Sequence, residues 1–345
     1  IAYYYSLLIE LYGPIPFTPE VIFPVDAPTS DLMTPQVPYD KIVDWIDKEL
    51  KEVSTKLPAV YPSNNDWGRA TSIMALAIRA NTLLYAASPL FNGNPDLKDW
   101  KNSEGESLFT ANADPQKWKK AADAYKELIT AAEVGGYGLY YEYNTDGTID
   151  PFMSCYNVSL KRFSDGNKEI IFGRPYNTDI NWWQAHHLPK GIGGNAAMGT
   201  TQELVDAFFM KNGIAPITGY NGDGSPIINP KSGYVEKGFS TAVESRHTKW
   251  PGGGSTSLAD KTTGMSPVTL DGTYNMYCNR EPRFYVSVIF NEAWLGVANR
   301  RVNFLQGGQD TDMTFDSPQN GYNVRKGVSL DVNPKDNKYT YQPGI

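Results

Sequence analysis

The chain has few of the residues on which most metal sites and disulfide frameworks depend. Its 345 residues include three histidines and two cysteines. His186 and His187 are adjacent, so their side chains diverge, whereas zinc ligands usually stand at spacings that converge. Cys155 and Cys278 are either free buried thiols or one disulfide, and their separation decides neither. We therefore expect no zinc site and leave the state of the two thiols open.

Long apolar runs and an excess of positive charge are also missing. The longest apolar runs fall well short of the roughly 18 residues that cross a bilayer. Lys and Arg total 31 against 38 Asp and Glu, a net charge of −7. An acidic surface argues against binding to nucleic acids or anionic membranes. We expect neither kind of partner.

Common catalytic motifs are absent from the sequence as well. It contains no G-x-S-x-G, Walker or H-E-x-x-H string. Residues 191–196 fit G-x-G-x-x-A by letter, but no strand pattern precedes them and no long helix follows, so they read as a flexible glycine loop. No carboxylates stand out as an acid–base pair. We predict a protein that is not an enzyme and has no catalytic residues.

Two oxygen-rich strings, residues 144–150 and 310–316, resemble calcium loops. The second lacks the glycine at the sixth place and the closing glutamate of an EF-hand. The Asp-Gly pair in the first is also an ordinary turn. We expect solvated turns and no cofactor, with Ca²⁺ binding as the alternative.

Aromatic residues are what the chain has in abundance, with 22 Tyr, 14 Phe and 8 Trp. An indole face can stack on the apolar face of a sugar ring, and nearby amides can bond its hydroxyls. Trp182 and Trp183 lie in a polar stretch predicted to be extended, where neighbouring side chains face opposite ways, so one of the two would contact ligand. The predicted ligand-binding residues are Trp182, Trp183, Trp250, Trp294, Tyr220 and Asn181.

The first third of the chain has the periodicity of helices. Apolar residues recur at helical spacing in residues 1–12, 39–57, 68–91 and 115–134. Asp40 and Asp114 are the expected N-caps, and Pro89 with Gly93 is expected to end the alanine-rich helix. Trp45 and Trp118 are expected in the core, and Arg79 is expected to bond neighbouring loops. Paired helices of this length resemble tetratricopeptide packing, although the 34-residue period is not kept.

From about residue 137 the pattern changes. Residues 169–174 and 282–290 are predicted strands, and residues 200–210 a short helix capped by Thr200 or Thr201, with Glu203 in a capping box with Thr200. Residues 212–275 show almost no pattern and are predicted to be loop. The fold class predicted is mainly α: helical pairs as a scaffold, a large loop-rich excursion and a few short strands.

Five segments in order resemble strings of the SusD/RagB family of Bacteroidetes-like bacteria. Residues 68–93, GRATSIMALAIRANTLLYAASPLFNG, are similar to the family's "GRAT…ALxARxxLYAASPLFNG" helix. AYYYSLLIELYGPIP, TQELVDAF, REPRFY and GYNVRK match four further family strings. Joint occurrence in order makes the resemblance specific. It implies one SusD-like domain over residues 1–345, with a helical scaffold at 1–135 and a ligand-facing region at 136–345.

The resemblance implies a lipid-anchored protein on the extracellular face of the outer membrane. Such proteins capture oligosaccharides and deliver them to a SusC-like TonB-dependent transporter. The alternatives are a peptide-binding member of the same family, or a helical scaffold of the transporter complex that binds no ligand. The family's lipid-anchor cysteine and late helix do not occur in these residues, so we expect an internal fragment truncated at both ends.

Overall fold

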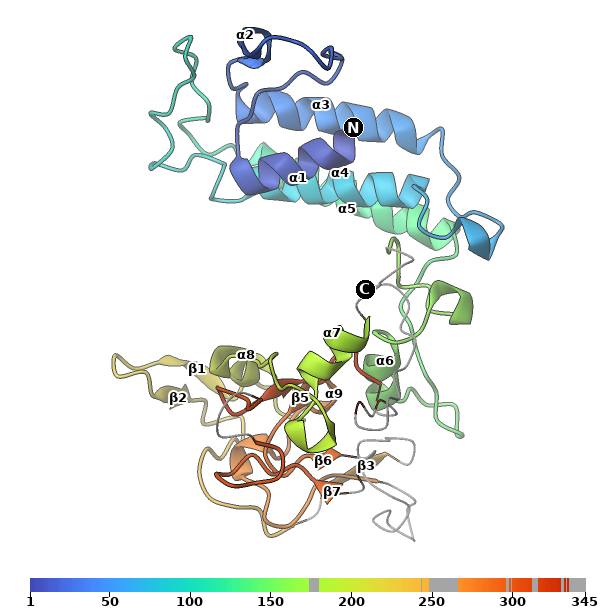
Figure 1. Cartoon of the computed structure of the whole chain (residues 1–345), viewed down its shortest axis with the longest axis vertical. Helices are drawn as coiled ribbons and strands as arrows, with labels where there is room; N and C mark the ends of the chain where they lie inside the picture. Colours follow the sequence, from blue (N-terminus) through green and yellow to red (C-terminus); the bar gives the residue numbers. More distant parts are fainter. Residues whose placement is uncertain are drawn as a thin grey trace. The chain divides into compact units, whose positions relative to one another are not determined.

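The computed structural model divides into two compact units, which are described separately. Unit 1 comprises Ile1–Gly138 and Lys168–Gly173, and unit 2 comprises Leu139–Asn167 and Arg174–Ile345 (Figure 1). The structure describes residues 1–173, 180–242, 244–247, 266–295, 300–311 and 316–329, with the single positions 298, 332 and 334. Within these ranges, no helix has both the length and the apolar character needed to span a membrane.

Unit 1 is built from helices, and all four long helices predicted from the sequence are confirmed. Its elements are α1 (Ala2–Tyr12), α2 (Thr29–Leu32), α3 (Tyr39–Ser54), α4 (Ser72–Ala87) and α5 (Gln116–Val134), with a 3₁₀ turn at Asn64–Asp66. The central helix is α4, which packs against both α3 and α5. Small buried residues, Ala75 and Ala80 among them, allow this close approach.

The ends of α4 follow from local chemistry. The Thr71 hydroxyl accepts a hydrogen bond from the Met74 N–H at 3.1 Å and caps the first turn. At the other end, Ser88 precedes Pro89 and is extended, with ψ of 153°. The helix therefore ends at Ala87, two residues before the proline and four residues short of the predicted end at 91.

A tight turn after α4 requires a glycine. Gly93 has a φ of +76°, and a Cβ there would lie 2.3 Å from the Ala113 backbone nitrogen. The Asn92 side chain accepts from the Asp114 N–H at 2.8 Å and donates to the Asp114 carbonyl oxygen at 2.9 Å. The end of the family string therefore joins two distant segments of unit 1.

Several side chains of unit 1 differ from expectation. Pro38, not Asp40, holds the N-cap position of α3, and the Asp40 carboxylate instead pairs with Lys117 at 2.6 Å. Pro115 takes the N-cap position of α5, although Asp114 does accept the Gln116 N–H at 2.9 Å. Trp45 is half-buried, and Trp118 is 49% exposed rather than part of the core.

Arg79 is a larger correction, because it joins helices rather than loops. Its Nε lies 2.6 Å from Asp47 Oδ1 on α3, and its Nη1 lies 2.7 Å from Glu127 Oε2 on α5. The Arg79 side chain is buried between them. The buried Arg79 thus joins three helices through two ion pairs, one with the largely buried Asp47 and one with the more exposed Glu127.

Unit 2 is a mixture of short helices and two-stranded antiparallel sheets. Its helices are α6 (Pro151–Asn157), α7 (Ile180–His187), α8 (Gln202–Ala207) and α9 (Pro282–Ser287), with 3₁₀ turns at Phe163–Asp165, Lys190–Ile192 and Asn275–Tyr277. The strand pairs are β1 (Ile217–Tyr220) with β2 (Pro226–Ile228), β3 (Glu244–His247) with β4 (Ser266–Thr269), β5 (Val288–Ile289) with β8 (Asn323–Val324), and β6 (Trp294–Leu295) with β7 (Arg300–Arg301).

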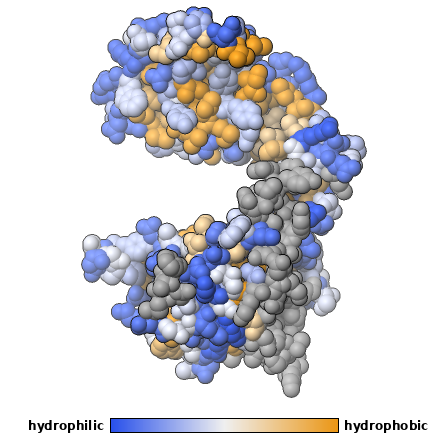
Figure 2. Space-filling model, in the orientation of Figure 1, coloured by the Kyte–Doolittle hydropathy of each residue, from blue (hydrophilic) through white to orange (hydrophobic). Residues whose placement is uncertain are grey.

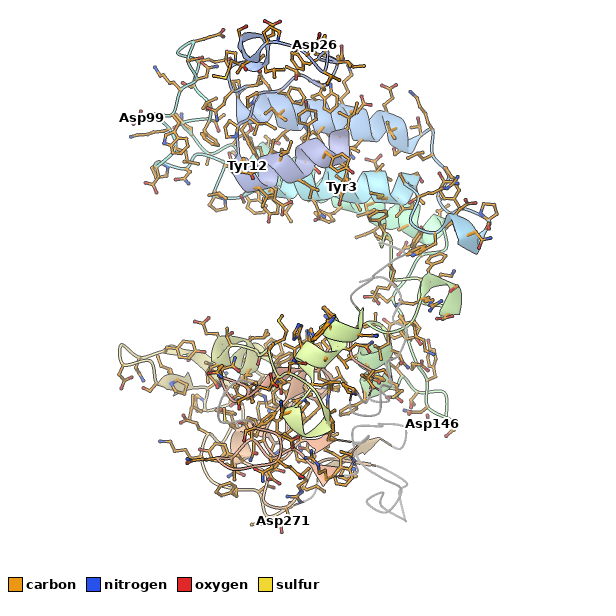
Figure 3. The ribbon with its side chains drawn as sticks, viewed as in Figure 1. Tyr3, Tyr12, Asp26, Asp99, Asp146 and Asp271 are labelled. Carbon is orange, nitrogen blue, oxygen red and sulfur yellow. The ribbon has the colours of Figure 1, made fainter. Side chains whose placement is uncertain are left out.

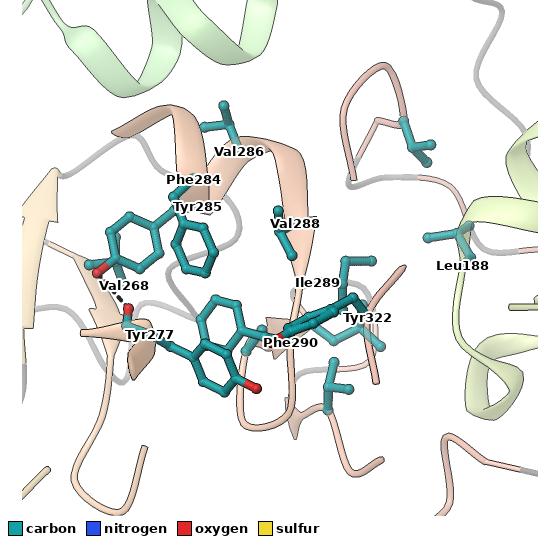
Figure 4. Close-up of a cluster of buried hydrophobic side chains, with 14 of the residues drawn as sticks. Leu188, Val268, Tyr277, Phe284, Tyr285, Val286, Val288, Ile289, Phe290 and Tyr322 are labelled. Carbon is teal, nitrogen blue, oxygen red and sulfur yellow. Dashed lines mark hydrogen bonds between the residues drawn. The ribbon is translucent and has the colours of Figure 1, made fainter. Parts of the chain in front are cut away.

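An aromatic cluster forms the core of unit 2. The rings of Tyr277, Phe284, Tyr285 and Phe290 gather there, and the Tyr285 hydroxyl donates to the Tyr277 carbonyl oxygen at 3.0 Å (Figure 4). Arg280 is fully buried beside them, its guanidinium carbon 5.0 Å from the centre of the Phe284 ring. Its guanidinium donates to the carbonyl oxygens of Val205 and Phe208, which anchors α8 and the turn after it to this core.

The two predicted strands are not strands over their whole length. Residues 282–287 form α9, with Pro282 at its first position, and only Val288–Ile289 pairs as β5. Because Phe284, Tyr285 and Val286 are all buried, their apolar run suits either element, and tertiary packing selected a helix. Residues 169–173 contain no strand among the residues described, and residues 217–228 of the predicted loop form the β1–β2 hairpin.

Candidate ligand-binding surface

Trp182 and Trp183 lie on helix α7, not in an extended stretch as predicted. In a helix, neighbouring side chains point about 100° apart rather than in opposite directions. Trp182 is 63% exposed, whereas Trp183 is half-buried and packs against the core of unit 2. Asn181, which precedes them, is exposed. The helix therefore separates the two indoles into one outward and one inward residue.

Each indole pairs with the histidine one turn later. The ring centroids of Trp183 and His187 are 4.0 Å apart, and those of Trp182 and His186 are 5.9 Å apart. His187 Nδ1 is hydrogen-bonded to the Trp183 carbonyl oxygen. Burial is the main cause that lowers the pKa of His187, which favours the neutral ring at neutral pH. The two histidines thus pack on the indoles one turn earlier in α7.

A backbone ladder holds α7 to strand β8. The Met198 N–H donates to the His186 carbonyl oxygen at 2.9 Å, and the Val324 N–H donates to the Met198 carbonyl oxygen at 2.9 Å. Further along, the Asn320 amide donates to the Thr200 carbonyl oxygen, and the Tyr322 hydroxyl donates to Gln202 Oε1 at 2.8 Å. Residues 320–324 therefore connect α7 to the start of α8.

Tyr220 is anchored to α8 through a carboxylate. Its hydroxyl donates to Asp206 Oδ2 at 2.9 Å, and Gln202 Nε2 donates to Asp206 Oδ1 at 2.9 Å. Loss of solvent and then the Asp206 carboxylate raise the pKa of Tyr220 to about 12. Because the hydroxyl is engaged while the residue remains 42% exposed, the ring is presented as a fixed apolar face.

These contacts define what we call the α7–α8 surface, carried by one hydrogen-bonded framework of α7, β8, α8 and β1. Sequence reasoning missed its exposed Met198, Gln202 and Asn320. Gln202 stands in the TQELVDAF string, but nothing local marked the other two. Thr201 rather than Thr200 caps α8, through the Leu204 N–H at 3.2 Å. The exposed members of the surface are Asn181, Trp182, Met198, Gln202, Tyr220 and Asn320.

Of the two other predicted ligand-binding residues, the structure describes only Trp294. Trp294 is half-buried in β6, and its carbonyl oxygen accepts from Arg325 Nη2 at 2.8 Å. The Trp294 indole nitrogen is buried and has no hydrogen-bond partner among the described residues. Trp250 lies outside the described residues. Trp294 thus takes part in the packing between β6 and the segment after β8.

The two calcium-like strings are engaged in structural contacts. The buried Asp310 carboxylate accepts from Arg300 Nη2 and from the Asn303 N–H, each at 2.8 Å. Asp146 accepts from the Thr148 N–H at 3.0 Å, and Asp150 caps α6. Residues 312–315 lie outside the described residues. Among the residues that the structure describes, no group of three or more His, Cys, Asp or Glu could hold a metal ion, and Cys155 and Cys278 are not joined in a disulfide.

Comparison with known proteins agrees with this architecture. A solved structure named BT4246 is similar to this chain, with 25% sequence identity and a TM-score of 0.70. The match covers 95% of this chain and 56% of the BT4246 chain. A SusD-like protein of Bacteroides fragilis NCTC 9343 is similar as well, with 20% sequence identity and a TM-score of 0.55. This match covers 94% of this chain and 48% of that protein. A third solved structure is named as a SusD-like carbohydrate-binding protein of the same strain and has 16% sequence identity and a TM-score of 0.54. This match covers 94% of this chain and 46% of that protein.

The fold is thus that of SusD-like proteins, a mainly helical class. Residues 161–344, more than half of the chain, match the model of the SusD family, and the chain belongs to that family. The chain spans about half the length of the solved structures that it resembles. None of the curated proteins matches its sequence.

Proposed function

We propose that this protein binds oligosaccharides on the α7–α8 surface of unit 2. The observation that carries the proposal is Trp182, an indole left 63% exposed on a helix whose next residue is packed into the core. Exposing one indole while its neighbour anchors the helix presents a rigid stacking platform at little entropic cost. Family membership and the carbohydrate-binding name of one structural neighbour support the same ligand class.

The chemistry of the surface suits a sugar ring. Trp182 and Tyr220 offer apolar faces, and Asn181, Gln202 and Asn320 offer amide groups for hydroxyls. If each ring removes roughly 100 Å² of apolar area from water, the two contribute about 5 kcal/mol. Association costs at least about 4 kcal/mol, and each added hydrogen bond returns about 1 kcal/mol. With about three or four such hydrogen bonds the net free energy is about 4–5 kcal/mol, which corresponds to dissociation constants of about 1 mM to about 0.2 mM.

The wider role that we propose rests on the family. A weak, reversible sugar site suits a cell-surface protein that captures oligosaccharides and passes them to a SusC-like TonB-dependent transporter, without catalysis of its own. The place of action would be the extracellular face of the outer membrane, through a lipid anchor. A peptide ligand is the second candidate, because aromatic and amide side chains also bind peptides.

Binding to a panel of oligosaccharides and polysaccharides, measured by calorimetry and affinity gels, tests the proposal. We expect Trp182→Ala to weaken glycan binding at least about tenfold, because a stacked ring contributes more than 1.4 kcal/mol. Tyr220→Phe should bind like the parent, and Tyr220→Ala should bind more weakly. Trp118→Ala is the matched control, since Trp118 is also an exposed helical tryptophan but lies in unit 1.

Two results would contradict the proposal. If Trp182→Ala binds glycans as tightly as the parent, the α7–α8 surface is not the site. If the parent binds peptides of a protein digest and none of the glycans, the peptide-binding alternative replaces it. Capture of a SusC-like transporter with no ligand binding at all would favour a purely structural role.

A further inference from the structure

Unit 1 contains a small cavity between α1, α3 and α4. Its volume is about 100 Å³, the share of about three water molecules at roughly 30 Å³ each. The polar residues that line it are Ser6 and Glu10 from α1, Tyr39 from α3, and Asn81, Thr82 and Tyr85 from α4. The cavity lies in a different unit from the α7–α8 surface and is independent of it.

Tyr39 is the unexplained residue in this lining. It is 1% exposed, and its hydroxyl has no hydrogen-bond partner among the described residues. The ring cannot turn away, because it stacks on Phe91 with centroids 4.3 Å apart. Burial raises the pKa of Tyr39, and the nearby Asp40 and Glu10 carboxylates raise it further. A buried polar group of this kind calls for a partner that the described residues do not supply.

The other polar groups of the cavity present acceptors. The Ser6 hydroxyl donates a hydrogen bond to the Tyr3 carbonyl oxygen at 2.7 Å. The Thr82 hydroxyl likewise donates to the Ile78 carbonyl oxygen at 2.9 Å. Both oxygens keep lone pairs for a further donor. The Glu10 carboxylate raises the pKa of the neighbouring Tyr85 hydroxyl and adds a negative charge to the lining. The lining therefore favours a cation rich in donors.

A primary ammonium group fits this lining better than a guanidinium. Lysine ends in a compact charge with three donors on a flexible stem, whereas the donors of arginine lie in one plane. Here the acceptors come from three different helices. The Tyr3 and Tyr85 rings in the lining can contact the stem and the charge. The small volume suits an unbranched stem.

An exposed apolar face lies on α1, the helix that forms one wall of the cavity. Figure 2 shows hydrophobic residues gathered over α1 of unit 1, and Figure 3 places Tyr3 and Tyr12 toward opposite ends of this helix. Tyr4, Leu8, Leu11 and Tyr12 are all exposed, and Leu84 of α4 is exposed as well. A free amine could fill the cavity but would leave this face in water. Contiguous apolar surface of this kind is typical of a protein-binding site.

We propose that unit 1 docks a protein segment that inserts one lysine side chain into this cavity and covers the α1 face with apolar side chains. The ammonium group bonds Tyr39, Ser6 and Thr82 and pairs with Glu10. The apolar residues on either side of the lysine pack on Leu8, Leu11 and Tyr12. Charge complementarity at the cavity and apolar area around it thus specify the same partner segment.

The first test probes the cavity with n-butylammonium, which copies the lysine stem and head, and with n-butanol as its neutral analogue. We expect saturable ¹⁵N-amide shifts at Ser6, Glu10 and Thr82 with the ammonium and none with the alcohol. Glu10→Gln should weaken binding at least fivefold, and Tyr39→Phe at least twofold. Glu133→Gln on α5 is the control for loss of an exposed carboxylate. Equal responses to both probes, or unchanged affinity in Glu10→Gln, would overturn the proposal.

The second test separates a docked protein segment from a free amine. The probe is an acetylated peptide with Leu-Leu-Lys-Leu-Leu at its centre and glutamines at its ends, compared with the same peptide carrying Nε-acetyllysine. We expect the lysine peptide to bind at least tenfold more tightly than n-butylammonium, and acetylation to abolish the difference. Leu8→Ser with Leu11→Ser should weaken the peptide but not the amine. A peptide that binds no better than the amine would overturn the docking of a protein segment.

Discussion

Trp183 and His187 form a ring pair on α7, with their centroids 4.0 Å apart and one helical turn between them. Both side chains face the interior of unit 2, and His187 is also hydrogen-bonded to the Trp183 carbonyl oxygen. This pair sets the rotation of α7 about its axis. Trp182 is left outward as a consequence, so the exposure of the candidate stacking residue depends on its buried neighbours.

The two tryptophans should therefore respond differently to substitution. Trp183→Ala removes half-buried contacts with the core, and we expect the free energy of unfolding to fall by about 2 kcal/mol, below the 3–5 typical of a fully buried ring. Trp182→Ala should change it by no more than about 0.5 kcal/mol. Urea unfolding followed by circular dichroism measures both. Equal losses in the two variants would contradict the assignment of inward and outward faces.

His187 gives the stability of unit 2 a defined dependence on pH. Its pKa is lowered in the folded protein, so the unfolded chain binds the proton more readily as pH falls below about 6.5. The contribution is fully present above that value and is lost as pH falls through the pKa of the folded state. We expect stability to decrease more between pH 7.5 and pH 5 in the parent than in His187→Gln.

His186→Gln is the neighbouring control for this measurement. His186 stands at the next position on α7 but is only half-buried. It should retain the parent's fall in stability between the two pH values. If His187→Gln shows the same fall as the parent, His187 does not carry the effect.

The ion pairs of the buried Arg79 side chain should contribute more than fully exposed pairs in the same unit. Arg79→Met leaves Asp47 without one of its two cationic partners, and the Arg79 and Asp47 side chains are only 8% and 16% exposed. We expect a loss of about 2–3 kcal/mol. Lys119→Met, which breaks an exposed pair with Asp123, should cost no more than about 0.5 kcal/mol. A comparable loss in both variants would show that burial of the Arg79 pairs is unimportant.

Gly93 should tolerate substitution less well than another glycine of similar backbone angle. Gly93→Ala places a Cβ against the Ala113 backbone, in addition to the cost of a positive φ. We expect a loss of about 2–5 kcal/mol, the sum of the two effects. At Gly105, φ is +82° but nothing lies within 4 Å of the added Cβ, so Gly105→Ala should cost about 1–2 kcal/mol. Thermal unfolding of both variants compares them, and equal costs would exclude the steric contribution.

Local patterns succeeded where an element carries its own signals. Residues 68–91 have helical spacing and a proline near their end, and a helix forms within them at Ser72–Ala87. The same reasoning failed at residues 282–287. Their apolar run is buried on all sides, and the buried Arg280, bonded to the carbonyl oxygen of Val205 75 residues away, helps to determine the packing there. A window of neighbouring residues carries no information about such a contact.

The candidate site shows the same division. Composition pointed to aromatic stacking, and the string around Trp182 drew attention to the segment on which the proposed site is built. The helical form of that segment, and the roles of Met198 and Asn320, follow from hydrogen bonds to β8 and to Thr200. Arg79 is a further example, because its partners on α3 and α5 lie 32 and 48 residues away.

The sequence alone thus determined the long helices of unit 1, the mainly helical class and the family, because periodicity, caps and ordered strings are local properties of the chain. Only the tertiary structure decided which indole is exposed, which apolar run becomes a helix, and which buried hydroxyl lacks a partner. Burial is set by contacts between residues far apart in the chain. Those contacts exist only once the elements have packed.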